Sequence, residues 1–192
     1  GSRKVFENEL PSTWEHSVDN KKRFLVANNT PEFRSISNNF KQAMSGRCSQ
    51  IIKIERIQNE RWYIQYSAHK KDFRQRLGTD TEKCLYHGCP DDAANSIIDS
   101  CFDRNYAGQH GTLYGYGVYF SSNAAYSHDY TSTNTRGERC MFVVRVLIGK
   151  ATPGNGKMKT RPVGYDSTTG ENHIFVVYHD AQAYAEYLIT YK

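Results

Sequence analysis

The spacing of apolar side chains changes along the chain, and it separates predicted helices from predicted strands. A helix over 59–77 is predicted because five side chains fall on one helical face: Trp62, Tyr66, His69, Phe73 and Leu77. Gly78 is placed to end it. Another helix is predicted from Pro31 to about Met44, because Thr30 suits an N-cap and Glu32 the first turn. Further helices are expected over 91–102, capped by Asp91 or Asp92, and from Ser122 or Asn123 onward.

Shorter apolar stretches predict strands. Residues 139–150 are almost continuously apolar, which is typical of a central strand. Other strands are expected at 49–58, 84–88, 118–120, 173–179 and 184–191, whereas 3–30, 103–117 and 151–172 are predicted to be irregular. Trp14 is expected to be the first core anchor. The order of elements is not a regular strand–helix alternation, so we predict a single α+β domain over 1–192.

Composition and charge exclude some classes of protein. The formal net charge of +5 is compatible with an anionic ligand, but Lys and Arg are scattered, so a nucleic-acid-binding domain is the weakest alternative. The five cysteines form no repeated CxxC, which indicates free thiols in a reducing compartment and predicts no metal site. No apolar run reaches the roughly 18 residues of a membrane span, and no leader is visible. Gly1 and Ser2 are typical of residues left by an expression vector.

The stretch YGYGVYFSSNAAYSHDY at 114–130 has three interpretations. A dinucleotide-binding loop is excluded, because Phe120 occupies the third glycine position and the residues after Gly117 indicate a strand. Core packing explains the aromatic residues without any ligand. A slot for a flat ring instead requires Tyr119 to face Tyr130, with the Ser127 hydroxyl and a glycine backbone nearby. His-Gly at 87–88 supplies such a glycine at a strand end.

Three blocks carry a resemblance to a known family. LYHG at 85–88, YGYGVYFSSNAAYSHDY at 114–130 and HIFVVYHDAQAYAEYLITY at 173–191 resemble the catalytic domain of poly(ADP-ribose)-polymerase-type, diphtheria-toxin-like ADP-ribosyltransferases. KIERIQN at 53–59 and QAYAEYLIT at 182–190 are most similar to the macrodomain-bearing members that transfer single ADP-ribose units. The resemblance implies split antiparallel β-sheets that pinch an NAD cleft and are flanked by helices. It also implies that the N-terminal stretch is too short for a helical regulatory subdomain.

The resemblance also assigns roles. The catalytic positions correspond to His87, Tyr119 and Ile174, and NAD would be bound by His87, Gly88, Tyr119, Ser127, Tyr130 and Arg104. His87 would bind the ribose next to adenine, Gly88 and Ser127 the nicotinamide carboxamide, and Tyr119 with Tyr130 would flank the nicotinamide ring. Loop 103–117 would lie over the pyrophosphate. Tyr126 is expected to be a packing residue. Gly88→Trp is expected to fill the nicotinamide wall and leave the fold intact.

Ile174 stands where this family often has a glutamate. Without that carboxylate a ribose hydroxyl is a poor nucleophile, so we predict transfer of one ADP-ribose to protein side chains, including the enzyme's own, with no metal. The acceptor residue type stays open. The alternative is a catalytically inactive module that binds NAD or ADP-ribose. We expect an intracellular monomer, cytoplasmic or nuclear or both, with NAD and acceptor proteins as partners.

Overall fold

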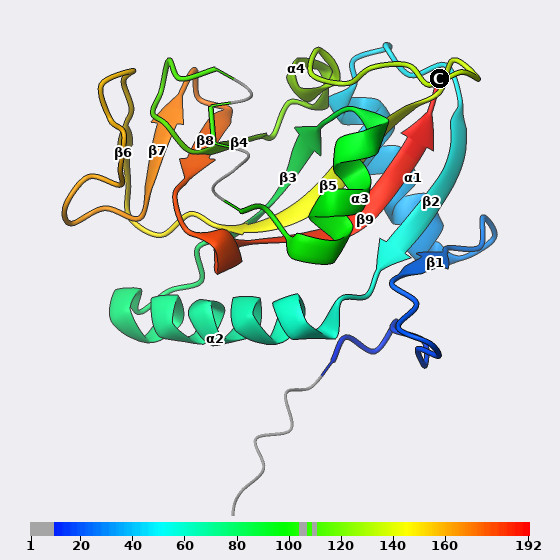
Figure 1. Ribbon diagram of the computed structural model, residues 1–192, viewed down its shortest axis with the longest axis horizontal. Helices are drawn as coiled ribbons and strands as arrows, with labels where there is room; N and C mark the ends of the chain where they lie inside the picture. Colours follow the sequence, from blue (N-terminus) through cyan, green and yellow to red (C-terminus); the bar gives the residue numbers. More distant parts are fainter. Residues whose placement is uncertain (1–9, 104–106, 109–110) are drawn as a thin grey trace, which may run out of the picture.

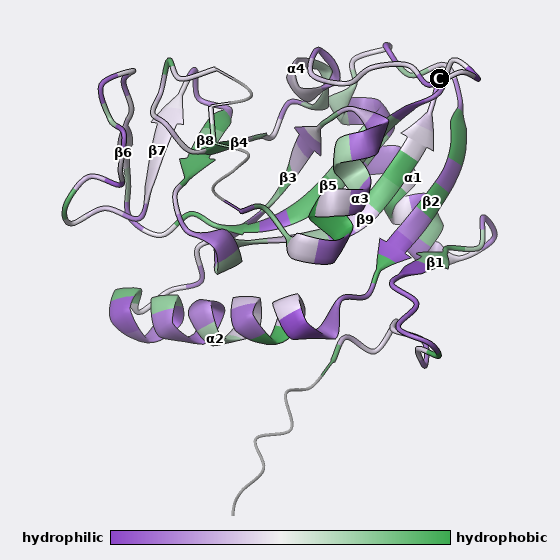
Figure 2. Cartoon of the chain, in the orientation of Figure 1, coloured by the Kyte–Doolittle hydropathy of each residue, from purple (hydrophilic) through white to green (hydrophobic). Residues whose placement is uncertain are grey.

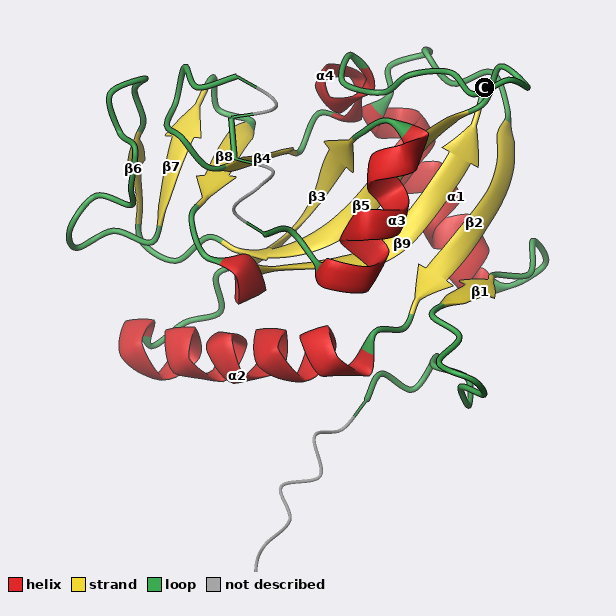
Figure 3. Cartoon of the chain, in the orientation of Figure 1, coloured by secondary structure: helices red, strands yellow, loops and turns green. Residues whose placement is uncertain are grey.

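The computed structural model describes residues 10–103, 107–108 and 111–192, and their strands form one nine-stranded sheet flanked by helices (Figures 1 and 3). The strand order is β1-β2-β9-β5-β3-β4-β8-β7-β6. The strands are β1 Arg23–Leu25, β2 Ile51–Ile57, β3 Glu82–Gly88, β4 Val118–Ser121, β5 Arg139–Leu147, β6 Ala151–Pro153, β7 Ser167–Gly170, β8 Ile174–Val177 and β9 Ala183–Tyr191. The helices are α1 Pro31–Ala43, α2 Glu60–Leu77, α3 Asp91–Ser100, α4 Ala124–His128 and the 3-10 helix η2 Asp180–Gln182.

The sheet is divided by a seam between β3 and β4. β3 pairs with β5 along its whole length, from Glu82 opposite Leu147 to Gly88 opposite Met141. By contrast, β3 and β4 share one register pair, Tyr86 opposite Ser121. One half therefore contains β1, β2, β9, β5 and β3, and the other contains β4, β8, β7 and β6. All pairs are antiparallel except β6 with β7. The predicted α+β architecture with a split antiparallel sheet is confirmed.

Helices cover both faces of the larger half. Side chains alternate along β5, so Met141 packs with Phe40 of α1 on one face, whereas Phe142 packs with Ile97 of α3 on the other. This burial on both sides explains why 139–150 is almost continuously apolar, and Figure 2 shows hydrophobic stretches along β4, β5 and β8. α2 lies along one end of this half, and Trp14 packs against the cluster that it forms there.

The predicted helix signals are confirmed for the two longest helices. The Phe33 amide donates to Thr30 Oγ1 at 3.2 Å, so Thr30 caps α1 as expected. Asn59 caps α2, and Gly78 ends it in the left-handed conformation with φ 71°. Among the described residues, no helix combines the length and the apolar character that crossing a membrane requires.

Three predictions about local structure were wrong. Pro90 is the N-cap of α3 and makes no side-chain cap bond, and Asp91 and Asp92 lie in the first turn, where the helix dipole favours them. Residues 151–172 contain β6 and β7, and 3–30 contains β1. These short strands lie at or next to the edges of the sheet and obtain their order from pairing, so their sequences lack apolar alternation.

Candidate active site

His87 lies at the seam and joins its two sides. Its ring is buried, 3% exposed, between Phe102 at 5.0 Å and Phe120 at 5.4 Å. Its Nδ1 lies 2.8 Å from the carbonyl oxygen of Tyr119. A carbonyl only accepts, so Nδ1 carries the proton. Burial lowers the pKa of His87 to about 4, so the ring is neutral at physiological pH and Nε2 is its acceptor nitrogen.

This side-chain bond takes the place of a backbone ladder between β3 and β4. The strands share one register pair at Tyr86, and the next residue reaches across to the β4 backbone at Tyr119 with its imidazole. The structure therefore brings His87 and Tyr119 together, as the sequence predicted. The contact is made through the backbone of Tyr119, and their catalytic roles stay predictions.

The Tyr119 side chain points to the opposite face from Phe120 and holds a loop. Its hydroxyl donates to the Gly115 carbonyl at 2.8 Å and accepts from the Tyr114 amide at 2.9 Å. Its ring, 3% exposed, packs with Ile174 and Val176 of β8. Two predicted catalytic positions, Tyr119 and Ile174, thus share one apolar cluster, which we call the Tyr119 cluster (Tyr119, Ile174 and Val176).

Gly88 lies against the backbone of α4. An added Cβ would lie 2.0 Å from the Ser127 carbonyl oxygen and 3.0 Å from Thr131 Cγ2, so this position admits no side chain. The buried Ser127 hydroxyl donates to the Tyr86 carbonyl at 3.3 Å. The two residues predicted to hold the carboxamide are therefore neighbours. The expectation that Gly88→Trp leaves the fold intact is wrong, because any side chain here must displace α4.

The two tyrosines of α4 and the residues after it pack on each other. The rings of Tyr126 and Tyr130 meet edge to face at 5.4 Å, and their hydroxyls are 3.2 Å apart. Tyr126 also packs against the Tyr119 cluster, which confirms its predicted packing role. It thus connects the cluster to Tyr130. Arg104, the predicted phosphate contact, lies outside the described residues.

A polar network beside Ile174 was missed by the sequence reasoning. Tyr114 Oη donates to Glu171 Oε1 at 2.8 Å. His173 Nε2 is 3.5 Å from Glu171 Oε2, and its Nδ1 is 2.8 Å from Ser121 Oγ. The available signal was an acid and a histidine in TGENH, immediately before Ile174. The prediction of an irregular loop over 151–172 gives Glu171 no defined neighbours, so this signal does not indicate a site.

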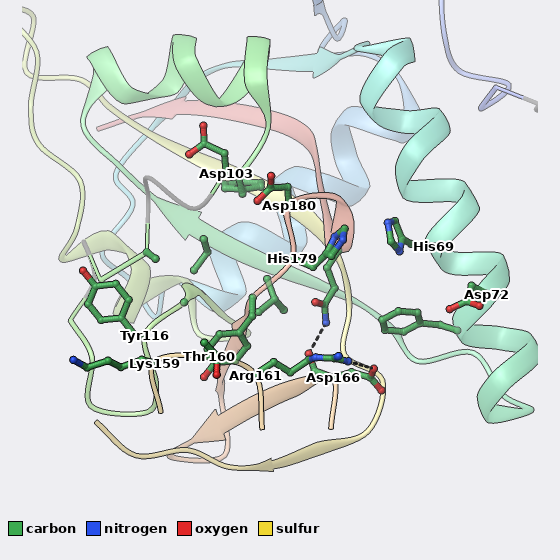
Figure 4. A pocket seen from close by; sticks show the side chains of 18 of the residues that line it. His69, Asp72, Asp103, Tyr116, Lys159, Thr160, Arg161, Asp166, His179 and Asp180 are labelled. Carbon is green, nitrogen blue, oxygen red and sulfur yellow. Dashed lines mark hydrogen bonds and ion pairs between the residues drawn. The ribbon is translucent and has the colours of Figure 1, made fainter. Parts of the chain in front are cut away.

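A pocket of about 930 Å³ lies at the other end of the β4–β8 ladder (Figure 4). Val118 and Val177, which pair there, line it, whereas Ser121 and Ile174 pair at the far end. Its polar lining includes the bond from Arg76 to Asp166, 2.7 Å, and the ring contact of His69 with His179, 4.5 Å. None of the six predicted site residues that the structure describes lines this pocket. Within the described ranges, no group of three or more His, Cys, Asp or Glu is arranged to hold a metal ion.

Comparison with known proteins defines the class. Residues 30–171 match the model of the poly(ADP-ribose) polymerase catalytic domain, and the chain belongs to this family. It is similar to human protein mono-ADP-ribosyltransferase PARP14, 34% identical over 96% of the chain and 11% of that protein. It is 33% identical to mouse mono-ADP-ribosyltransferase PARP10 over 85% of the chain and 19% of that protein. It is 30% identical to human mono-ADP-ribosyltransferase PARP12 over 95% of the chain and 28% of that protein. The chain thus spans much less than half the length of these relatives.

Proposed function

We propose that the chain is an NAD-dependent protein mono-ADP-ribosyltransferase, which moves one ADP-ribose from NAD to a protein side chain and releases nicotinamide. The observation that carries the proposal is the 2.8 Å contact of His87 Nδ1 with the Tyr119 carbonyl across the seam. It sets the orientation and the tautomer of the histidine relative to β4. Both residues lie within the matched residues 30–171, and the relatives are named as mono-ADP-ribosyltransferases.

The residues present fit an NAD donor. Nδ1 of His87 is committed to Tyr119, so Nε2 is the ring nitrogen that would accept from a ribose hydroxyl when NAD is bound. The Gly88 backbone lies against Ser127 without a side chain between them, and a backbone amide, a carbonyl and a hydroxyl are the groups that would pair with a carboxamide. The Tyr130 ring beside Tyr126 supplies an aromatic edge for the nicotinamide. NAD itself brings a glycosidic bond whose leaving group departs as a neutral amide.

Ile174 supports transfer of a single unit. Positive charge develops on the sugar carbon as the glycosidic bond breaks, and a carboxylate at this position would stabilise it. Ile174 is 2% exposed within an apolar cluster and supplies neither charge nor a base. Orientation of the donor must therefore contribute more of the rate. A ribose hydroxyl of bound ADP-ribose finds no base at residue 174, so this position does not promote chain growth.

The first test is to incubate the domain with NAD and measure its intact mass. We expect discrete additions of single ADP-ribose units. Ser127→Ala is expected to raise the KM for NAD about tenfold, the effect of about one lost hydrogen bond. Ser122→Ala, at an exposed neighbouring position, is the matched control and should leave the KM unchanged.

Two results would contradict the proposal. A long ladder of additions would refute the single-unit argument from Ile174. Thermal stabilisation by NAD without any addition, on the domain or on added acceptor proteins, would favour the inactive NAD-binding module.

We further propose that the acceptors include the chain itself and that the domain acts as a monomer in the cytoplasm, the nucleus or both, with no metal and no nucleic-acid partner. The free cysteines support a reducing compartment: Cys48, Cys84, Cys89, Cys101 and Cys140. Size-exclusion chromatography with light scattering tests the monomer. Unchanged transfer after treatment with a chelator is the result expected of a metal-independent enzyme.

A further inference from the structure

The turn between β7 and β8 holds Glu171 in an unusual backbone conformation. Glu171 and Asn172 both have positive φ, 49° and 62°, and the His173 amide closes the turn on the Gly170 carbonyl at 3.3 Å. Two-residue hairpin turns with positive φ at both positions favour Asn-Gly, and glutamate is a poor choice for the first of them. Such strain costs of order 1 kcal/mol and is concentrated at functional sites. The strained backbone therefore marks Glu171 as a candidate functional residue.

Tyr114 places the Glu171 carboxylate beside the candidate active site. Tyr114 and Tyr126 both pack against the Tyr119 cluster. Tyr114 donates its hydroxyl to the carboxylate at 2.8 Å. The pKa of Tyr126 is raised by burial, by its hydrogen bond with Tyr130 and also by the charge of Glu171. The carboxylate is 60% exposed, so it lies at the rim of the Tyr119 cluster, open to an incoming protein.

His173 supports the carboxylate from the other side. The Asn123 amide donates to Ser121 Oγ at 2.9 Å, and the same oxygen forms a hydrogen bond with His173 Nδ1, 2.8 Å away. On its other side the His173 ring places Nε2 3.5 Å from Glu171 Oε2. The His173 ring is also fixed by the edge of Tyr126 at 5.3 Å. Tyr114 and His173 are thus positioning residues for Glu171.

We propose that Glu171 is the base for the acceptor, and that the site therefore modifies protein hydroxyl side chains, serine above all, in preference to carboxylates. The inference rests on the proposed function and names its acceptor class. The acceptor O–H bond breaks and its proton passes to the Glu171 carboxylate, while the oxygen forms a bond to the ribose C1′. The bond from C1′ to nicotinamide breaks with its electron pair going to the ring nitrogen, so nicotinamide leaves neutral.

The charge of Glu171 also explains the selectivity. A serine hydroxyl needs a base, and Ile174 supplies none. A carboxylate acceptor needs no base, but it must approach a second carboxylate that is already ionised, and like charges at short range repel. The same site therefore assists one acceptor class and opposes the other.

The test uses two acceptor peptides that are identical except for serine or glutamate at one position, with the domain and NAD. Wild type is expected to prefer the serine peptide. Glu171→Gln should lower kcat for serine about a hundredfold, in the range of general base catalysis, and leave transfer to glutamate unchanged or faster. Glu171→Asp should restore part of the rate, and Tyr114→Phe should lower it less than Glu171→Gln. Glu60→Gln, at an exposed carboxylate on α2, is the matched control.

Thermal stabilisation by NAD shows in each variant that the fold and donor binding persist. A wild type that prefers the glutamate peptide, or a Glu171→Gln variant that keeps its serine rate or loses both rates equally, overturns the acceptor inference alone. A wild type that modifies neither peptide and adds nothing to itself overturns the proposed function with it.

Discussion

At the residue scale, His87 is the side chain on which the site depends most. It is a buried, neutral imidazole that donates from Nδ1 to the carbonyl of Tyr119 across the seam. Its protonation would place a charge between Phe102 and Phe120, in surroundings that cannot solvate it. The fold therefore penalises protonation of this residue.

This penalty predicts how stability depends on pH. Burial lowers the pKa of His87 from 6.5 to about 4 in the folded state, so between these values the unfolded chain binds more protons and stability is lost as pH falls. The expected loss due to His87 is about 2 kcal/mol between about pH 7.5 and about pH 5. His87→Asn keeps a donor near the Nδ1 position but does not titrate. Urea denaturation should therefore show a shallower pH dependence in this variant.

His16→Asn serves as the control, since His16 is exposed, and it should follow wild type. Parallel pH profiles for wild type and His87→Asn would show that His87 is not buried as a neutral ring.

The candidate site could be predicted only where motifs report it. His87, Gly88 and Tyr119 were predicted from the resemblance of LYHG and YGYGVYF to the family, and the structure places them at one seam. The partner of Gly88 did not follow, because the approach of the α4 backbone at Ser127 is a tertiary contact. Glu171 did not follow either, because its place depends on a strained turn and on Tyr114, 57 residues earlier in the chain.

At the scale of elements, Asn59 joins two helices. Its side-chain oxygen accepts from the Trp62 amide at 3.4 Å and so caps α2. Its side-chain nitrogen donates to the carbonyls of Ile98 and Asp99 at the end of α3, at 2.9 and 3.2 Å. The residue is 6% exposed, so water cannot replace these bonds easily.

We therefore predict that Asn59→Ala lowers the free energy of unfolding by about 2–3 kcal/mol, from one lost cap and the lost bond to the Ile98 carbonyl, whereas the Asp99 carbonyl keeps the Trp62 indole as a donor. Asn123→Ala is a matched control, because Asn123 caps α4 by a bond to the Ala125 amide at 3.0 Å but bridges no second helix. That variant should cost about 1 kcal/mol. Equal losses in chemical denaturation would show that the contact with α3 contributes nothing.

The length and apolar pattern of each element decide whether it could be predicted from the sequence. α1, α2, β5 and β9 are long, and the patterns of their own apolar side chains determine them. β6 at the edge of the sheet and β7 beside it are short strands whose order comes from pairing, Thr152 opposite Thr168 for example, and their own pattern is not apolar. The cap of α3 was misassigned because Pro90 already provides the extended backbone that precedes a helix.

At the scale of the molecule, the seam divides the sheet into halves of unequal pairing. β5 pairs with β9 from Arg139 opposite Tyr191 to Val146 opposite Ala183 and with β3 on its other side. β8 pairs only over its short length with β4 and β7 in the described chain. We expect native-state amide exchange at Val176 to be at least about tenfold faster than at Val144, which corresponds to local opening of the smaller half.

His87→Ala should widen this difference, because it removes the side-chain link across the seam. The amide of Thr168, which also lies in the smaller half, should exchange at about the same rate as the amide of Val176. Uniform exchange rates in the two halves would show that the sheet opens as one unit in spite of its single register pair.

The seam also has a consequence for which ligands and inhibitors the enzyme can distinguish. In a regular sheet, neighbouring strands are held about 4.8 Å apart by their ladder, whatever their side chains. Where β3 and β4 diverge, the gap is instead filled by the volume of His87, Phe102 and Phe120. The width available beside Gly88 can therefore be altered by exchanging ring-bearing side chains while both ladders stay in register. With Gly88 in the proposed nicotinamide site, exchanging these ring-bearing side chains is expected to change the selectivity for bulkier NAD analogues.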